Sequence, residues 1–328
     1  MKVFVTGATG VLGRPAVRRL VAAGHTVRGL SRSPENAALL RRLGAEPVDA
    51  DLFDLVSLRT ALRDADAALH LATKIPPSSR AWRLSAWAEN DRIRREGTRA
   101  LVTAALASPT VKTFVYPSFA LVYPDRGDEW IDAENTPAAS TAIEQTTLDA
   151  EAEVARFAAA GDGRRGLSLR MGALYSPDAP SAQDQLRIAR LGFAPVPGRP
   201  EGYMPLVWVD DAANALVIAL ERGGSGVYDI VDDHPLRRAE IATAIAVAVG
   251  RKRLRNLPTW LMDLAGGPGT EALSRSQRVS NSRFKAATGW TPSVPDARIG
   301  MPLLVQPDAR RAGEAAPSDT PAHLAARK

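Results

Sequence analysis

The sequence contains no cysteine, and this absence excludes disulfide bonds, thiolate nucleophiles and zinc sites with cysteine ligands. Lysine is almost as scarce, with six in 328 residues, because arginine carries nearly all of the positive charge. Long apolar runs are missing too: the longest, such as Ile241–Val249, fall far short of the ~20 residues that a membrane-spanning helix needs. The chain opens on a strand pattern and a glycine turn, which differs from a signal peptide. We therefore expect a cytoplasmic protein without a membrane partner.

The composition is that of a globular protein. Hydrophobic residues make up 45% and charged residues 24% of the chain, and its 328 residues suit one large domain or a domain with a smaller lobe. The net charge is +6, which can indicate a nucleic-acid partner, but no recognition motif or dense basic stripe accompanies it. We interpret the surplus as surface arginine and expect no nucleic-acid partner.

Strand and helix patterns alternate from the N-terminus to about residue 171, which predicts a parallel sheet covered by helices on both faces. The first strand pattern, Lys2–Thr6, is separated from the first helix pattern, Pro15–Ala23, by glycines at 7, 10 and 13. Gly7 permits a tight turn, Gly10 lets the backbone approach a pyrophosphate, and Gly13 lets the helix pack against the strand. The start of the helix then offers free amides to phosphate groups. The alternative is a tight turn that holds no ligand.

The end of the second strand pattern favours one nicotinamide cofactor over the other. NAD sites carry an acidic residue about 20 residues after the turn, bonded to the ribose hydroxyls. Here no carboxylate follows Val27 before Glu35, whereas Arg32 stands where it would pair with a 2′-phosphate, with Ser31 and Ser33 beside it. We therefore predict NADPH/NADP+ as the cofactor. The alternative is that Arg32 is a solvated surface charge.

These patterns predict an α/β fold of the Rossmann type, a doubly wound parallel sheet, together with a smaller C-terminal α/β lobe, to which the family resemblance assigns the substrate. Residues 1–175 are assigned to the NADP-binding domain, and a strand and a helix within 207–230 return to it. Residues 176–206 and 231–306 are assigned to the substrate-binding lobe. Residues 307–328, rich in Ala, Pro and Arg, are predicted to be a flexible tail.

Motifs along most of the chain resemble the extended short-chain dehydrogenase/reductases, the NAD(P)-dependent epimerase/dehydratase group. They include TGATGVLG at 6–13, EGTRALVTAA at 96–105, VKTFVYPSFALVY at 111–123, LRMGALYSP at 169–177 and VWVDDAANALVIALE at 207–221. The resemblance implies a six- or seven-stranded Rossmann sheet in a monomer or homodimer. Together with Arg32, the expected cofactor contacts are Gly7, Thr9, Gly10, Val11, Leu12, Gly13, Asp51, Leu52, Leu71, Ala72, Thr73, Gly172, Ala173 and Leu174.

The catalytic set of that family does not carry over. The family uses a tyrosine as general acid/base, a lysine four residues later that lowers its pKa and holds the ribose, and a Ser or Thr after the fifth strand. None of the five tyrosines here is followed by lysine at that spacing, and no lysine occurs between 113 and 251. By register, Ile143 and Thr147 occupy the Tyr and Lys positions, and Phe119 the Ser/Thr position. Ser118 and Thr147 remain as the candidate polar groups, and no metal is predicted.

Large apolar side chains are frequent in the segments expected to cover the substrate. They are Ile75, Pro76, Pro77, Trp82, Trp87, Phe193, Tyr203, Met204, Trp260, Leu261 and Met262. Among them we select Ile75, Tyr203 and Met204, with Ser118, as substrate contacts. A wide apolar pocket suits a bulky aromatic molecule; the alternative is packing between the lobes.

The missing Tyr/Lys pair and the apolar segments resemble atypical ketoreductases of aromatic polyketide antibiotic pathways. The expected function is NADPH-dependent reduction of an angucyclinone-like ketone, an oxidoreductase reaction with hydride from NADPH and a proton from the substrate or water. One alternative is a non-catalytic NADP(H)-binding regulatory or redox-sensing protein. Another is a relative of the sugar-nucleotide epimerases and dehydratases.

Overall fold

The computed structural model describes residues 1–77, 80, 83–255 and 273–305. The predicted tail at 307–328 and four of the apolar residues named above, Trp82 and Trp260–Met262, lie outside the described residues. None of the described helices is long and apolar enough to cross a membrane.

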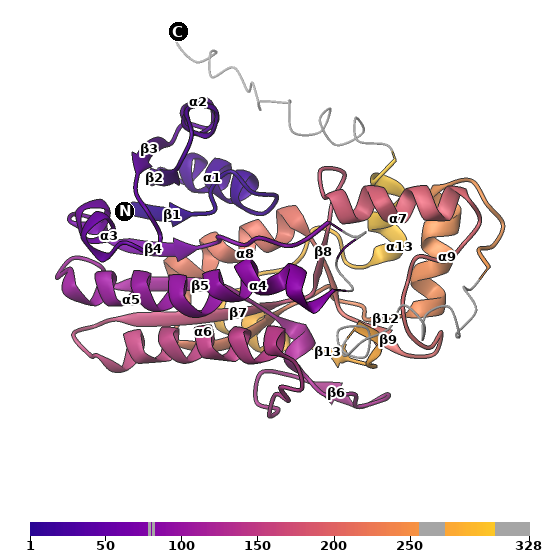
Figure 1. Ribbon diagram of the computed structural model, residues 1–328. Coiled ribbons are helices and arrows are strands. Elements are labelled where there is room, and N and C mark those ends of the chain that lie inside the picture. Colours follow the sequence, from indigo (N-terminus) through magenta and orange to yellow (C-terminus); the bar gives the residue numbers. More distant parts are fainter. Residues whose placement is uncertain (78–79, 81–82, 256–272, 306–328) are drawn as a thin grey trace, which may run out of the picture.

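Seven parallel strands form the central sheet, in the spatial order β11-β7-β5-β4-β1-β2-β3 (Figure 1). The chain starts in the middle of the sheet, runs outward through β2 and β3, and returns to continue on the other side of β1. This order confirms the predicted doubly wound α/β fold. The strands are β1 (Lys2–Thr6), β2 (Thr26–Ser31), β3 (Glu46–Asp49), β4 (Ala67–His70), β5 (Thr113–Phe119), β7 (Arg165–Met171) and β11 (Gly226–Ile230).

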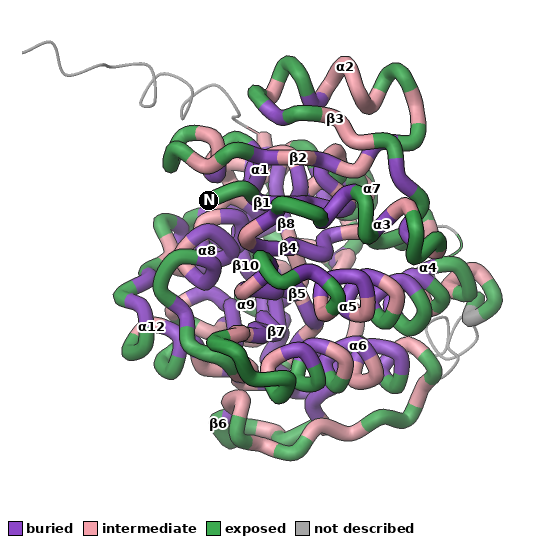
Figure 2. The backbone as a smooth tube through the Cα atoms, turned by 90° about the vertical axis from the view of Figure 1, so that its left-hand side faces the viewer, coloured by how far each residue is buried: buried purple, intermediate pink, exposed green. Residues whose placement is uncertain are grey.

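Successive residues of a strand point to opposite faces of the sheet, so each buried strand serves two cores. Val3 and Val5 of β1 belong to one cluster with α1 and α8, whereas Phe4 between them belongs to a second cluster with α3, α5 and α6. In Figure 2 the exposed residues gather on loops and on the outer sides of helices such as α2. The covering helices are α1 (Gly13–Ala22), α2 (Pro34–Arg42), α3 (Leu55–Leu62), α5 (Thr98–Ala107), α6 (Ala142–Ala159) and α8 (Val209–Arg222).

A smaller lobe lies at the end of the sheet to which β1 and β4 point (Figure 1). Its apolar cluster joins α7, α9 and α13 with the short strands β8, β9, β10 and β12. Within the range 231–306, however, α12 packs on β11 and α8 of the sheet layer through Phe284. The remaining elements are β6 (Trp130–Ile131), β8 (Ala173–Tyr175), α7 (Pro180–Arg190), β9 (Tyr203–Met204), β10 (Leu206–Trp208), β12 (Leu236–Arg237), α9 (Arg238–Ala248), β13 (Arg278–Val279), α12 (Ser282–Thr288) and α13 (Ala297–Leu303).

The helix that precedes β5 is not a uniform α-helix. It begins as α4 (Ala88–Arg92), passes through a π-helical segment, η2 (Ile93–Gly97), and continues as α5. The first half is anchored to the segment after β4, because the side-chain oxygen of buried Asn90 accepts a hydrogen bond of 3.0 Å from the Lys74 amide. π-Helical turns inside α-helices are rare and occur frequently at functional sites.

Candidate cofactor and substrate site

The glycine turn lies where the direction of the strand order reverses, between β1 and β4. Gly7 has φ +68°, and a Cβ atom there would overlap the Leu71 carbonyl and come within 2.5 Å of the Ala72 nitrogen. A Cβ atom on Gly13 would overlap the Gly7 carbonyl oxygen. Both glycines are therefore required by the fold of the turn itself, as the sequence predicts.

Gly10 differs from the other two. A Cβ atom there would meet one neighbour, the Gly7 carbonyl oxygen, at a tight 3.2 Å, so the backbone at Gly10 is less crowded than at Gly7 or Gly13. α1 begins at Gly13 with neither a side-chain cap nor an acidic residue in its first turn. Free amides and an open backbone approach at a helix start are what a pyrophosphate requires. The turn therefore fits the phosphates of a dinucleotide, and the predicted contacts Thr9, Val11 and Leu12 lie in or next to it.

The ends of β2 and β3 continue the same edge of the sheet. Arg32 is exposed and makes no hydrogen bond or ion pair with the part of the chain that the structure describes. Ser33 instead caps α2, because its hydroxyl accepts from the Asn36 amide at 3.2 Å. After β3, the Asp51 carboxylate accepts from the Phe53 amide at 2.9 Å and stays exposed, whereas Leu52 is buried. Of the side chains predicted to recognise a 2′-phosphate, Arg32 is the one left available.

In the segments after β4 and β7, more of the predicted contact residues are buried or hydrogen-bonded within the protein. Leu71 is buried, Ala72 is half-buried and Thr73 is exposed. After β7, the Gly172 amide donates to the Ile230 carbonyl at 3.0 Å and the Ala173 amide to the Pro205 carbonyl at 2.9 Å. Leu174 packs against the cluster formed with α1 and α8. The Gly172 amide therefore holds the end of β7 to β11, and the Ala173 amide holds the start of β8 to the residue before β10.

His70, the last residue of β4, is fully buried beside Thr6. Its Nδ1 lies 2.7 Å from the Thr6 hydroxyl, and its ring stacks on Tyr116 with the ring centres 5.9 Å apart. Burial lowers the pKa of His70 to about 4, so the ring is neutral at physiological pH. His70 is thus a structural residue of the strand.

At the positions predicted by register to correspond to the family's catalytic tyrosine and lysine, the chain has a half-buried Ile143 and a buried Thr147 on α6. The Thr147 hydroxyl donates to the Ile143 carbonyl at 2.7 Å and accepts from the Arg94 guanidinium at 2.8 Å. An isoleucine has no proton to exchange, and a threonine carries no charge. Arg94, which comes from the π-helical segment, escaped the sequence analysis.

Ser118 belongs to a buried polar network that the sequence analysis also missed. Its hydroxyl donates to Glu151 on α6, and both Glu151 oxygens accept from Arg170 on β7, at 2.9 and 2.7 Å. Arg170 also donates to the Tyr123 hydroxyl, which donates to Asp229 on β11, each at 2.9 Å. Burial raises the pKa of Asp229 to about 7. An arginine within the otherwise apolar segment LSLRM was the available signal for this network.

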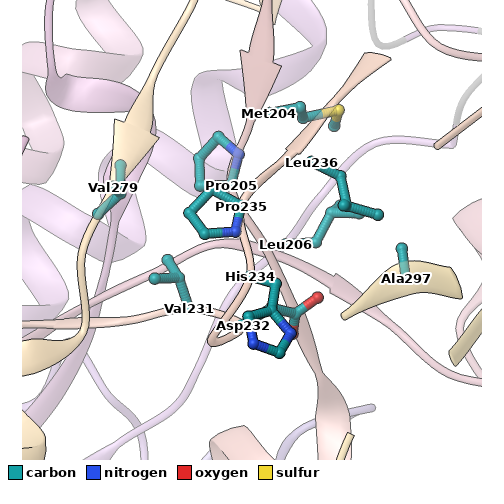
Figure 3. Close-up of a pocket in the computed structure, with 10 residues that line it drawn as sticks. All are labelled: Met204, Pro205, Leu206, Val231, Asp232, His234, Pro235, Leu236, Val279 and Ala297. Carbon is teal, nitrogen blue, oxygen red and sulfur yellow. The ribbon is translucent and has the colours of Figure 1, made fainter. Parts of the chain in front are cut away.

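The predicted substrate contacts lie in different surroundings. Ile75 is 63% exposed in the segment after β4. Tyr203 is buried under the guanidinium groups of Arg237 and Arg278, 4.6 and 5.2 Å from its ring centre. Met204 lines a small cavity inside the lobe, at the opposite end from Asp232 and His234 (Figure 3). Within the described ranges, no group of three or more His, Asp or Glu side chains is placed to hold a metal ion.

Comparison with known proteins agrees with this arrangement. The model of the NAD dependent epimerase/dehydratase family matches residues 3–231. A 3-diazoavenalumate denitrifying reductase from a Streptomyces species is 33% identical over 92% of this chain and 99% of its own length. A 4-hydroxy-2-methyl-3-oxo-4-farnesyl-3,4-dihydroquinoline-1-oxide ketoreductase from Stigmatella aurantiaca is 28% identical over 79% of this chain and 76% of its own.

Among solved structures, the human epimerase family protein SDR39U1, determined with NADPH, superposes with a TM-score of 0.78 at 25% identity. The alignment covers 93% of this chain and 99% of the human chain. The sheet order, the open glycine turn and the family match agree with one another. The chain belongs to the NAD dependent epimerase/dehydratase family and is an oxidoreductase that depends on a nicotinamide cofactor.

Proposed function

We propose that this protein is an NADPH-dependent reductase. Its substrate would be a bulky aromatic compound that is reactive enough to be reduced without a proton donor from the protein. The observation that carries this proposal is the pair of residues on α6: Ile143 and Thr147 stand where a proton donor and its supporting cation would be. NADPH, when bound, supplies a hydride. The remaining requirement is a substrate whose reduction needs no acid from the protein.

The preference for NADPH over NADH rests on Arg32. It is exposed at the end of β2, without a partner among the described residues, and the first carboxylate after that strand is Glu35. The guanidinium is therefore available to a 2′-phosphate. The structural neighbour determined with NADPH supports the same choice.

The first substrate class is an aromatic polyketide ketone of the angucyclinone type. The carbonyl carbon accepts the hydride, and the carbonyl oxygen takes a proton to become a hydroxyl. A phenol next to the ketone, or a water molecule, would supply that proton. The ketoreductase named among the relatives acts on an oxo group of a bicyclic ring system, which supports a ketone.

The second substrate class is an aromatic diazo compound, and the full-length match to a denitrifying reductase favours it. In the diazonium form, the ring carbon accepts the hydride while the C–N bond breaks and N₂ leaves. This replacement of nitrogen by hydrogen consumes no proton. The reaction therefore does not need a Tyr/Lys pair as a proton donor. Epimerases and dehydratases, in contrast, must remove a proton from a hydroxyl group, for which no base stands at 143 or 147.

One experiment distinguishes these possibilities. The purified protein would be incubated with NADPH deuterated at the transferable position, and with either a ketone bearing a neighbouring phenol or an aryl diazo acid. We expect deuterium on the new carbinol carbon in the first case, or on the ring carbon that lost nitrogen in the second. The O-methyl ether of the phenol is the matched control, because it removes the internal proton donor. Tight NADPH binding without turnover of either class would instead indicate a regulatory or sensing protein.

We propose that the protein acts in the cytoplasm. Its partner would be a small hydrophobic aromatic molecule, and the protein would be a monomer or a homodimer. The solution mass from light scattering tests the oligomeric state, and a mass above that of two chains would contradict it.

A further inference from the structure

Arg94 is a buried cation on the π-helical segment, and its side chain reaches across to α6. The residue is 8% exposed. One terminal nitrogen of its guanidinium donates to the Thr147 hydroxyl at 2.8 Å and contacts the Ile143 carbonyl at 3.4 Å. The guanidinium also acts on Tyr116, where it opposes the rise in the pKa of the hydroxyl that burial causes. These partners are neutral groups.

The other buried arginines of the described chain are compensated more fully. Arg170 is paired with Glu151, and Arg275 with Glu144, at 2.7 and 2.6 Å. Arg238 has no carboxylate, but it donates to three backbone carbonyls at 2.7 to 2.9 Å. Arg94 has neither a carboxylate partner nor such a set of carbonyls among the described residues. Burying a charge without a counter-ion is costly, so an uncompensated guanidinium is expected where a ligand completes its surroundings.

The place of this cation is informative. Thr147 is the position at which the family carries its lysine, and the guanidinium lies directly on the Thr147 hydroxyl. The same terminal nitrogen reaches the carbonyl of Ile143, at the tyrosine position. A positive charge therefore lies beside positions 143 and 147, but it comes from Arg94 on η2 and not from α6 itself.

Arg94 and the residue that follows it contact α6 on different sides. Arg95, the next residue, points to the outer side of α6, where it binds Asp149 at 2.8 Å with nearly half of its side chain exposed. Arg94 points inward instead. Two adjacent arginines of η2 thus contact the same helix, one on its exposed side and one at the buried Thr147.

We propose that Arg94 is a cofactor-contacting residue that supplies, from η2, the positive charge that a lysine at position 147 would give to the ribose next to the nicotinamide. This inference rests on the proposed NADPH-dependent function. It makes Arg94 responsible for holding the nicotinamide end of the cofactor, whereas the glycine turn and Arg32 hold the phosphates and the adenosine end.

Two ligands separate this role from a merely structural one. NADPH contains the ribose next to the nicotinamide, whereas adenosine 2′,5′-bisphosphate lacks it and keeps the adenosine end. For Arg94→Gln we expect the dissociation constant of NADPH to rise about 10- to 100-fold, the range for a lost charge-assisted hydrogen bond, and that of the bisphosphate to stay within about twofold. Arg95→Gln is the matched control and should leave both unchanged.

A relocated charge provides the second test. In the double variant Arg94→Gln/Thr147→Lys, the lysine returns to α6, and we expect NADPH affinity to recover to within about fivefold of the unaltered protein. Arg94→Lys, which keeps the charge on η2, covers the case in which the glutamine variant is too unstable to titrate, and should lose less than Arg94→Gln. Melting temperatures are recorded for every variant.

The outcomes are distinct. Equal weakening of NADPH and the bisphosphate by Arg94→Gln would show a structural role and overturn the inference, as would unchanged NADPH affinity. Failure of Thr147→Lys to restore binding in a folded double variant would also overturn it. If the unaltered protein does not bind NADPH, the proposed function is wrong. If the unaltered protein binds NADPH and reduces a substrate, but Arg94→Gln leaves the dissociation constant of NADPH unchanged, only this inference is wrong.

Discussion

Removing the carboxylate of Glu151 should destabilise the protein strongly, because it breaks one side of a buried ion pair. Glu151 accepts both bonds from Arg170 and the bond from Ser118, all between buried side chains. Arg170 is 4% exposed, so water cannot replace the lost carboxylate without opening the layer between α6 and the sheet. Breaking one side of a buried pair typically costs 3–5 kcal/mol, because the remaining charge stays buried.

We therefore expect Glu151→Ala to lower the free energy of unfolding by about 3–5 kcal/mol, a large share of the roughly 5–15 kcal/mol that a folded protein has. Glu151→Gln keeps the size and one acceptor oxygen and should lose less. Urea unfolding followed by circular dichroism near neutral pH measures both. The slope of the free energy against urea should stay constant if the variants unfold from the same folded state.

Glu153 is the matched control, two residues along the same helix. It pairs with Arg99 and Arg156 at 3.1 and 2.7 Å, but those partners are 64% and 45% exposed. Exposed pairs contribute about 0–1 kcal/mol, so Glu153→Ala should change little. Equal decreases in the free energy of unfolding for Glu151→Ala and Glu153→Ala would refute the reasoning, because burial would then have no influence on how much an ion pair contributes to stability.

Three further predictions concern titration, cofactor choice and the turn. Because burial raises the pKa of Asp229 to about 7, above the ~4 of an unfolded chain, the folded state holds an extra proton between these values. Stability should therefore fall as pH rises from about 4 to 7, and Asp229→Asn should flatten this part of a pH series of unfolding curves. Arg32→Ala should weaken NADPH binding about 10- to 100-fold and leave NADH nearly unchanged; equal losses for both cofactors would contradict the 2′-phosphate assignment. Gly10→Ala, whose Cβ atom would make a single tight contact of 3.2 Å with the Gly7 carbonyl oxygen, should lower the melting temperature only modestly yet weaken NADPH binding in a fluorescence titration. Gly7→Ala should instead impair folding, because its Cβ atom would overlap the Leu71 carbonyl.

The sheet and its glycine turn were predictable because their causes are local. A buried strand shows as a continuous apolar run such as Lys2–Thr6, and the spacing of the three glycines follows from the shape of one turn. The structure reproduces both. The exclusion of a Tyr/Lys pair was equally secure, because it needs only the positions of the lysines.

The polar part of the site was not predictable in the same way. Arg94 and Thr147 are 53 positions apart, and their contact depends on a π-helical turn that has no marker in the sequence. The segment 88–97 is largely polar, so it shows little of the apolar periodicity that would indicate a helix there. Met204 was chosen for its bulk, and bulk alone does not distinguish the wall of a substrate pocket from the core of a lobe, where the structure places it.

The π-helical turn also sets the phase of the helix that contains it. Each residue of an α-helix advances about 100° around the axis, so one extra residue in a turn rotates everything before it relative to everything after it. Asn90, which anchors the segment after β4, lies before the turn, whereas Arg99, which binds α6 on the surface, lies after it. Deleting a single residue from η2 would restore a regular helix and put one of these two contacts out of register. The Lys74–Asn90 hydrogen bond and the Arg99–Glu153 pair are therefore compatible with each other only while η2 keeps its extra residue.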